Sequence, residues 1–251
     1  MDRIEKSKEK FNQLFGAGVT AAHAIDPDFQ DILNHIIFGE VFYQGNLDDK
    51  QRELITLVVL VTNQTLPQLK EHVSAALNVG LTPVEIKEAV YQCTPYIGFP
   101  KTLNATNEVN EVFKAKNIAL PIESQKTIDE DNRFQKGLAT QVEIFGDVIK
   151  KMQESAPSNQ KHIQEHLSTF CFGDFYTRGG LDLKTRELLT ICIVSALGGT
   201  ESQIKAHVHG NKNVGNDKET LITAITHCLP YMGFPRTLNA LACVNEIIPE
   251  N

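Results

Sequence analysis

The most hydrophobic stretch of the chain has the periodicity of an amphipathic helix. Its apolar residues follow the spacing i, i+3, i+4, i+7: Leu54, Leu57, Val58 and Val61. The same stretch is rich in β-branched residues (TLVVLVT, 56–62), which would also suit a buried strand. Asp48 and Gln51 form a helix-capping pattern. No Gly or Pro follows until Pro67, and this uninterrupted segment is too long for one strand. We therefore predict a helix that begins near residue 49.

Capping and breaking residues predict three further helices after this one. Thr65 with Gln68 is expected to open a second helix, which Gly80 ends. Residues 82–85 (TPVE) form a capping box with proline at the first helical position, so a third helix begins here. The proline-containing segment 95–100 is expected to end that helix and to start a fourth.

The same pattern occurs twice in the chain. Residues 47–56 (LDDKQRELIT) align with residues 181–190 (LDLKTRELLT), and seven of the ten positions are identical. Residues 95–105 (PYIGFPKTLNA) align with residues 230–240 (PYMGFPRTLNA), with nine of eleven identical. Two such matches at nearly the same offset indicate a tandem repeat. In the second copy, Pro230 is expected to end the third helix.

A polar junction separates the two copies. Residues 117–131 (NIALPIESQKTIDED) are rich in charge and poor in periodic apolar positions. We therefore expect a first repeat at 1–116, a linker at 117–131 and a second repeat at 132–251. Since no strand–helix alternation or Gly-rich phosphate loop is found, the predicted fold class is all-α, with a helical hairpin as the core of each repeat.

Composition and charge narrow the possible partners. The chain has 24 Lys and Arg against 31 Asp and Glu, a formal charge of −7, and no basic run, so nucleic acid is not expected. The longest apolar run is far too short to span a bilayer, and the charged N-terminus does not resemble a secretory signal. The five cysteines form an odd set without a C-x-x-C pair, which is typical of a reducing compartment. We expect a cytoplasmic protein without a membrane segment.

An Arg-Glu pair opens the most hydrophobic helix of each copy, at 52–53 and at 186–187. Glu53 lies four residues before Leu57, on the apolar side, and a buried carboxylate requires a partner. If the two helices are antiparallel and turn near Gln64, His72 comes nearly level with Glu53. The second copy offers Glu187 and His207 in the same way. An exposed Glu53 with an unrelated core His72 is the alternative.

These motifs resemble the carboxymuconolactone decarboxylase family. The resemblance rests on LDxKxREL, on the helix with His72 that ends at Gly80, and on Tyr96-x-Gly-Phe-Pro, each with its counterpart in the second copy. It covers about residues 15 to 115 and 145 to 248. It implies two tandem AhpD-like helical repeats.

The family has two chemical branches. In the alkylhydroperoxidase branch a C-x-x-C pair precedes the histidine, but this chain has Thr65 and Gln68 there, and Thr200 and Gln203 in the second copy. Peroxide chemistry requires a thiolate and a resolving thiol, so a peroxiredoxin-like antioxidant enzyme is the disfavoured alternative. The recurring Cys93 and Cys228 are expected to be packing residues.

The decarboxylase branch implies an enzyme that needs no cofactor. A carboxylated lactone or related cyclic acid would lose CO2 and take a proton on carbon. The resemblance makes Glu187, His207 and His227 the catalytic candidates, with Glu53 and His72 as those of the first copy. Arg186 would bind the substrate's carboxylate, and His207 would carry the proton. The substrate-binding candidates are Arg186, Arg52, Tyr231 and Tyr96.

The two copies differ at one of these positions, because His227 aligns with Gln92. This difference suggests that the second copy is the active one. Metal binding is not expected: His207 and His209, two residues apart on a helix, point in different directions, and His162 and His166 suit a solvated face. By analogy with the family, we expect a small-molecule substrate. We also expect a homo-oligomer, with a homotrimer as the particular state. A non-catalytic helical assembly module is the third reading.

Overall fold

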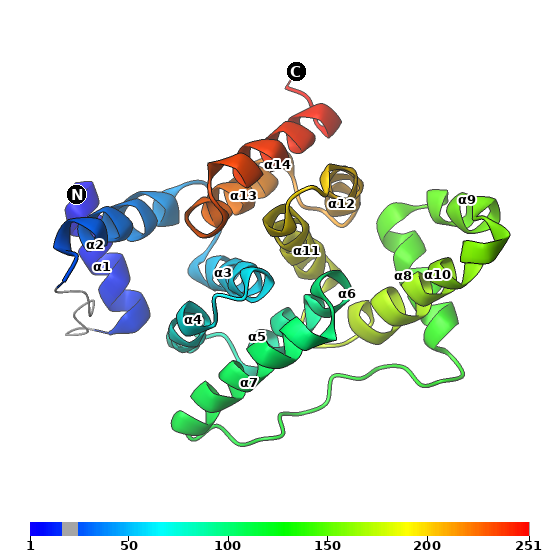
Figure 1. The fold of residues 1–251 in the computed structure, drawn as a ribbon, viewed down its shortest axis with the longest axis horizontal. Helices are drawn as coiled ribbons and strands as arrows, with labels where there is room; N and C mark the ends of the chain where they lie inside the picture. The colour runs from blue at the N-terminus through cyan, green and yellow to red at the C-terminus, as the bar shows by residue number, and fades with distance from the viewer. Residues whose placement is uncertain (17–24, 251) are drawn as a thin grey trace.

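The computed structural model describes residues 1–16 and 25–250, and this part of the chain is built from helices without strands (Figure 1). The first half holds α1 (Arg3–Phe15), α2 (Pro27–Asn34), η1 (His35–Glu40), η2 (Val41–Tyr43), α3 (Asp49–Asn63), α4 (Leu66–Asn78), α5 (Pro83–Gln92), α6 (Thr94–Ile97) and α7 (Phe99–Ala115). The second half holds α8 (Arg133–Phe145), α9 (Val148–Ser155), η3 (Ser158–Gln160), α10 (Lys161–His166), η4 (Leu167–Tyr176), α11 (Leu183–Leu197), α12 (Glu201–Asn213), α13 (Lys218–Met232) and α14 (Phe234–Ile247). The predicted all-α fold is confirmed.

The predicted hairpin core is α3 with α4 in the first repeat and α11 with α12 in the second. Asp48 and Gln51 form the expected capping box of α3. The chain turns at Gln64, whose φ of 58° is left-handed, and the Gln64 amide donates to the carbonyls of Val61 and Lys101. These side-chain bonds compensate for a conformation that residues other than glycine rarely adopt.

Thr65 and Thr200 are the N-cap residues of α4 and α12, as expected, but their hydroxyls donate to the carbonyls of Leu60 and Val194 and do not accept from the first turn. One local prediction was wrong. Pro230 does not end the third helix of the second repeat, because it lies inside α13. A proline removes one donor from a helix, and packing can retain the helix around it. The chain leaves the helix at Gly233, where φ is 80°.

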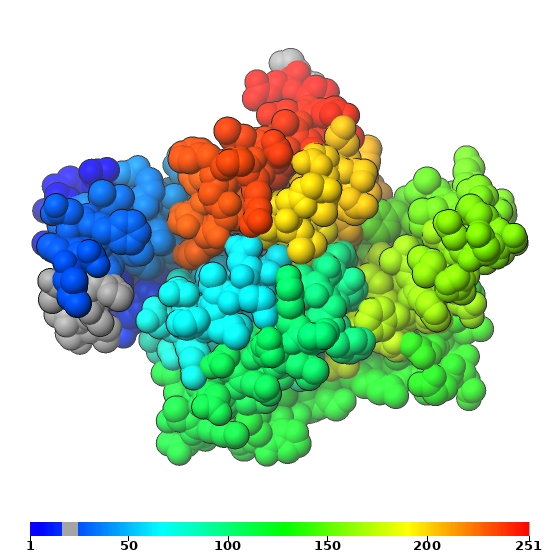
Figure 2. All heavy atoms as spheres, viewed as in Figure 1, coloured from blue at the N-terminus to red at the C-terminus, as the bar shows by residue number. Residues whose placement is uncertain are grey.

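The two repeats interlock through their longest apolar helices. α3 and α11 pack against each other near the centre, α13 packs on α3, and α5 packs on α11 (Figure 1). The side chains buried between these helices form one continuous apolar core shared by both repeats. Figure 2 shows the orange α13 region beside the blue N-terminal part of the chain, where α13 contacts η2. Each repeat therefore completes its core with helices from the other.

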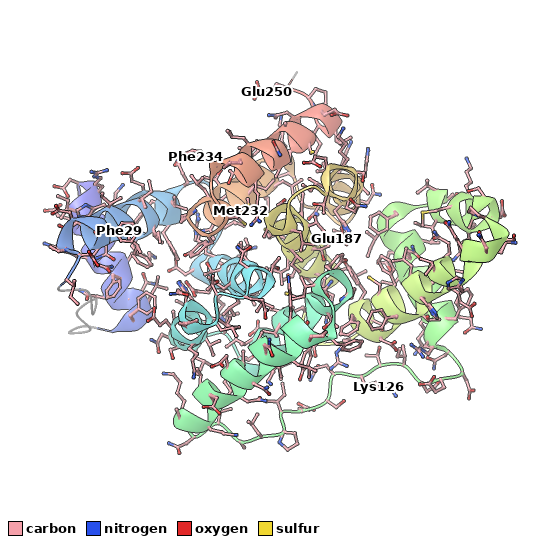
Figure 3. The ribbon with its side chains drawn as sticks, in the orientation of Figure 1. Phe29, Lys126, Glu187, Met232, Phe234 and Glu250 are labelled. Atoms are coloured by element: carbon pink, nitrogen blue, oxygen red, sulfur yellow. The ribbon has the colours of Figure 1, made fainter. Side chains whose placement is uncertain are left out.

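The connection between α7 and α8 runs along one edge of the molecule as an extended strip, on which Figure 3 labels Lys126. It is fastened to the second repeat at Gly179, whose amide donates to the carbonyl of Gln125, and at Thr127, whose hydroxyl donates to Thr177. Within residues 1–16 and 25–250, no helix is long and apolar enough to cross a membrane.

Candidate active site

The first site is built on a carboxylate and an imidazole from adjacent helices. Glu53 comes from α3 and His72 from α4, and the Nδ1 atom of His72 lies 2.9 Å from the Oε2 atom of Glu53. Glu53 is fully buried, which excludes the alternative of an exposed first-turn glutamate. Among the described residues, Nε2 of His72 has no hydrogen-bond partner, and 8% of the side chain is exposed. The dyad therefore presents one ring nitrogen toward the surface.

The second site repeats this arrangement. Glu187 on α11 and His207 on α12 are joined at the same 2.9 Å, and Figure 3 labels Glu187 in the interior of the bundle. The His207 side chain is 10% exposed. Each histidine also meets an aromatic ring from the helix that opens its repeat, Phe15 for His72 and Phe145 for His207. The predicted juxtaposition of Glu and His is thus found in both copies.

Each site takes its remaining residues from the other repeat. His227 and Tyr231 on α13 lie at the first site, where the Tyr231 and His72 rings are 5.8 Å apart. Gln92 and Tyr96 lie at the second site, where Tyr96 and His207 are 6.0 Å apart. The sequence analysis grouped His227 and Tyr231 with Glu187 and His207, and that grouping was wrong. It assumed that each repeat is complete alone, whereas the cores interlock.

The hydrogen bonds of His227 determine its protonation state. The Thr56 hydroxyl donates its single hydrogen to the carbonyl of Arg52, 3.0 Å away. It can therefore only accept from Nε2 of His227, at 2.9 Å. Nδ1 is then the unprotonated nitrogen, and it faces Nη1 of Arg52 at 3.5 Å. Burial, and then the charges of Arg52 and His72, hold the pKa of His227 well below its ordinary value. His227 is a neutral donor–acceptor bridge.

Gln92 makes the same bridge at the second site. Its amide nitrogen donates to the Thr190 hydroxyl at 3.2 Å, and its amide oxygen accepts from Nη1 of Arg186 at 2.9 Å. In these bonds each of the two side chains acts once as donor and once as acceptor. The difference between His227 and Gln92 is therefore conservative, and it does not mark the second copy as the active one.

Both arginines of the predicted substrate-binding set are occupied by the protein. Arg186 is fully buried, and it donates to Glu88, to Gln92 and to the carbonyls of Arg178 and Gly179. Arg52 donates to three backbone carbonyls, those of Val41, Gln44 and Leu47. Among the described residues, both guanidinium groups are engaged mainly by protein groups, and Nε of Arg186 is buried without a partner. The role of an anion clamp stays a prediction. Each holds the loop that precedes its own helix.

Tyr176, which no sequence motif pointed to, distinguishes the second site from the first. Tyr176 of the second site donates to Oε1 of Glu187 at 2.7 Å and lies 2.9 Å from the hydroxyl of Tyr96. Phe42 stands at the equivalent place in the first repeat, four residues after the aligned Phe-Gly motif just as Tyr176 is. Oε1 of Glu53 and the hydroxyl of Tyr231 are buried there without a partner among the described residues.

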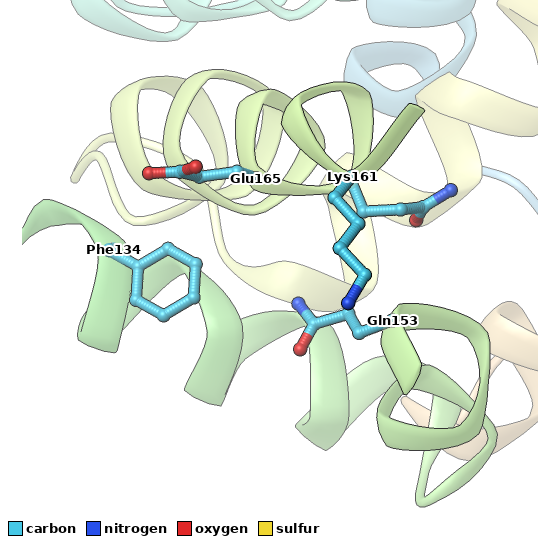
Figure 4. Close-up of a pocket in the computed structure, with 5 residues that line it drawn as sticks. Phe134, Gln153, Lys161 and Glu165 are labelled. Atoms are coloured by element: carbon cyan, nitrogen blue, oxygen red, sulfur yellow. The ribbon is translucent and has the colours of Figure 1, made fainter. Parts of the chain in front are cut away.

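Two surface pockets lie apart from both histidines. One has a volume of about 240 Å³ and is lined by Phe134, Gln153, Lys161, Gln164 and Glu165, of which Figure 4 labels four. The other, of about 420 Å³, lies between α8 and the start of α11, and it includes Tyr176 in its wall. Only the second pocket touches a residue of either site.

The thiols are placed for packing. All five cysteines are free and buried. Burial raises the pKa of Cys171 to about 12, and it also raises the pKa values of Cys93 and Cys228. Thiols with raised pKa values are poor nucleophiles, so the expectation that Cys93 and Cys228 pack in the core agrees with their burial.

His209 is exposed while His207 is buried, and the described residues contain no group of three potential metal ligands.

The profile of the Carboxymuconolactone decarboxylase family matches the chain twice, at residues 27–111 and 161–246. These segments make up more than half of the sequence, and the chain belongs to this family. Both matches contain the Glu–His dyad of their repeat, and they leave out α1 and α8, which supply Phe15 and Phe145.

Relatives with assigned activities are similar to parts of the chain. It is 28% identical over 124 residues to 4-carboxymuconolactone decarboxylase of Acinetobacter baylyi, a match that covers 49% of this chain and 92% of that protein. It is 34% identical over 76 residues to nitrosuccinic acid decarboxylase npaB of Metarhizium robertsii, covering 30% of this chain and 53% of that protein. An uncharacterized 15.0 kDa protein of Paracoccus denitrificans is 33% identical over 78 residues, which cover 30% of this chain and 58% of that protein.

Proposed function

We propose that this protein is a cofactor-independent decarboxylase of a small carboxylated lactone or related cyclic acid, and that its first site carries the reaction. Family membership and the two relatives named as decarboxylases support the reaction class. The observation that carries the choice of site is the unpartnered polar pair, Oε1 of Glu53 and the Tyr231 hydroxyl, next to His72. Buried polar groups without partners are costly, and a catalytic role is one physical explanation for them.

His72 is the proposed proton carrier. The bond from the substrate's carboxylate carbon to its neighbour breaks, CO2 leaves, and the electron pair moves into the conjugated carbonyl. The imidazolium of His72 then transfers its Nε2 proton to carbon and regains a proton from solvent. Glu53 holds Nδ1 at 2.9 Å, which fixes the ring orientation and compensates for the imidazolium charge.

The surroundings of His72 favour loss of a carboxylate charge. Rings of Phe15 and Tyr231 lie 5.5 Å and 5.8 Å from the imidazole, edge to face. With Arg52 bound to backbone carbonyls, the substrate's carboxylate lies in mainly apolar surroundings, where departure as neutral CO2 removes a poorly solvated charge. Burial and the Glu53 charge raise the pKa of Tyr231, so its hydroxyl stays protonated and can donate to a substrate oxygen.

Association of copies is a separate part of the proposal. Phe99 and Leu103 on α7, and Phe234 and Leu238 on α14, are exposed at matching places in the two repeats. Such repeated apolar pairs suit contacts with further copies of this chain, and a homotrimer is the state proposed by analogy with the family. The particle mass in solution, measured by light scattering, tests it; a monomer would contradict it.

A substrate screen tests the catalytic proposal. The purified protein is given a panel of carboxylated lactones and cyclic acids, and CO2 release is followed beside thiol-dependent peroxide loss. We expect CO2 release by the wild type, a loss of at least about 100-fold in His72→Ala, and activity within about twofold in the matched variant His207→Ala. Loss in His207→Ala alone would move the reaction to the second site. Peroxide loss without CO2 release would replace the proposed reaction with the antioxidant alternative.

A further inference from the structure

One difference between the two sites is a side-chain hydroxyl beside the glutamate of the dyad. In the second site the Tyr176 oxygen lies 2.7 Å from Oε1 of Glu187, 2.7 Å from the Thr190 hydroxyl and 2.9 Å from the Tyr96 hydroxyl. The matching atoms of the first site belong to Glu53, Thr56 and Tyr231. Glu53 and Thr56 align with Glu187 and Thr190 at an offset of 134, and Tyr231 aligns with Tyr96 at an offset of 135. The matching ring is Phe42, which has no hydroxyl.

The geometry around this place is conserved between the sites. Phe42 is tilted by 37° against Phe38, and Tyr176 is tilted by 37° against Phe172. The two Glu–His contacts have equal lengths, and the two tyrosine–histidine ring distances differ by only 0.2 Å, 5.8 Å against 6.0 Å. The dyads and the tyrosine–histidine pairs are therefore arranged alike, although the Phe42 and Phe38 rings are 5.7 Å apart and the Tyr176 and Phe172 rings 4.7 Å apart. The first site lacks the oxygen that Tyr176 supplies.

The three surrounding atoms define what can bind there. Oε1 of Glu53 needs a donor, and the Thr56 hydroxyl has already donated its hydrogen to Arg52, so it can only accept. The Tyr231 hydroxyl can donate. A hydroxyl group can donate its one hydrogen to Glu53 and accept from Tyr231, whereas water, with two hydrogens, can also donate to Thr56. A second carboxylate does not match, because Glu53 is itself an anion.

We propose that Glu53, Thr56 and Tyr231 form a polar subsite for a neutral hydroxyl group of the substrate, and that Tyr176 permanently fills the equivalent subsite of the second repeat. The substrate class is a small cyclic acid with a hydroxyl group in addition to the carboxylate that it loses. Placing this group on a decarboxylation substrate rests on the proposed function, whereas the subsite itself rests on the geometry alone. Water is the expected occupant in the free protein.

Two reciprocal substitutions test the subsite. Phe42→Tyr adds the oxygen to the first site, and Tyr176→Phe removes it from the second. The probe that needs no substrate is water itself, observed in high-resolution crystal structures of the wild type and both variants. We expect an ordered water within hydrogen-bond distance of Oε1 of Glu53 in the wild type, its replacement by the introduced hydroxyl in Phe42→Tyr, and a new water beside Glu187 in Tyr176→Phe.

Stability and kinetics give independent readouts. Phe42→Tyr should raise the Tm, because two buried polar atoms gain a partner, and Tyr176→Phe should lower it. For a hydroxylated substrate found in the screen, Phe42→Tyr should raise KM by at least about tenfold, and should leave the KM of the analogue without the hydroxyl within about twofold. If no substrate is found, the proposed function fails, but the water positions and Tm values still test the subsite. A wild-type structure without that water, or a lower Tm in Phe42→Tyr, would overturn it.

Discussion

The two sites share a Glu–His dyad but differ in how their polar atoms are satisfied. At the second site Glu88 binds Arg178 and Arg186 together, Tyr176 binds Glu187 and Tyr96, and Nε of Arg186 is the atom left without a partner among the described residues. At the first site Arg52 has only uncharged partners, and Glu53 and Tyr231 each keep a buried polar atom without a protein partner. A duplicated Glu–His pair can thus be kept in both copies while its surroundings differ.

The second site also has charged residues near its dyad where the first site has uncharged ones. The Glu88 position of the first repeat corresponds to Thr223 of the second, and Arg178 corresponds to Gln44. The ion triad is therefore found at the second site alone among the described residues. Buried ion groups can fix one geometry without adding stability, and we interpret the triad as a group that holds the second site in a single arrangement.

The largest expected effect concerns the buried arginines. Arg186→Met leaves the buried Glu88 with Arg178 alone, and we expect a loss of about 3–5 kcal/mol in the free energy of unfolding. The matched variant Arg52→Met removes bonds to neutral carbonyls and should cost about 1–3 kcal/mol. Urea unfolding of both variants measures the difference. Equal losses would contradict the view that only the second site holds a charged network.

The next largest effect separates the two dyads by activity. Glu53→Gln should lower kcat/KM by about 100-fold, because His72 loses the carboxylate that orients and compensates it. Glu187→Gln should keep activity within about twofold. Steady-state assays on a substrate from the screen, with circular dichroism to verify folding, measure both. A greater loss in Glu187→Gln would reverse the assignment.

A pH effect tests the neutral state of His227. The pKa of the folded protein's His227 lies well below its ordinary value of 6.5. As the pH falls below 6.5, the unfolded chain takes up a proton that the folded protein does not, so folding stability falls with decreasing pH. One proton corresponds to about 1.4 kcal/mol per pH unit. The wild type should therefore lose stability more steeply below pH 6.5 than His227→Gln, measured by urea unfolding. Parallel curves would show that the fold does not lower the pKa of His227.

The smallest effect is expected for exchanging the two bridges at neutral pH. His227→Gln and Gln92→His keep one donor and one acceptor, so each should change the free energy of unfolding by less than about 1 kcal/mol. Activity should stay within about twofold. His227→Ala is the control, because it leaves Thr56 without its donor and creates a cavity, and it should cost at least about 2 kcal/mol. A large loss of activity in His227→Gln with normal stability would restore His227 as a catalytic candidate.

Local features of the chain were readable because their causes lie within a few residues. The Leu54–Val61 stripe, the Asp48 cap and the 82–85 capping box depend on neighbours in the same turn or two, and the structure contains all of them. The Glu53–His72 contact was also within reach, since one hairpin with a known rise per residue places both residues. Pro230 was misread because packing on α3 decides whether its helix continues.

The amino-acid sequence alone was sufficient for the helical class, the tandem repeat and the pairing of Glu with His inside each hairpin, because hydrophobic periodicity and capping act over short distances. The assignment of His227 and Tyr231 to the first site, the engagement of both arginines and the contrast between Phe42 and Tyr176 required the folded molecule. These contacts join residues from 5 to 175 positions apart, and most of them depend on the shared core of the two repeats. The role of the hydroxyl at residue 176 follows only from the residues that contact it in the folded protein.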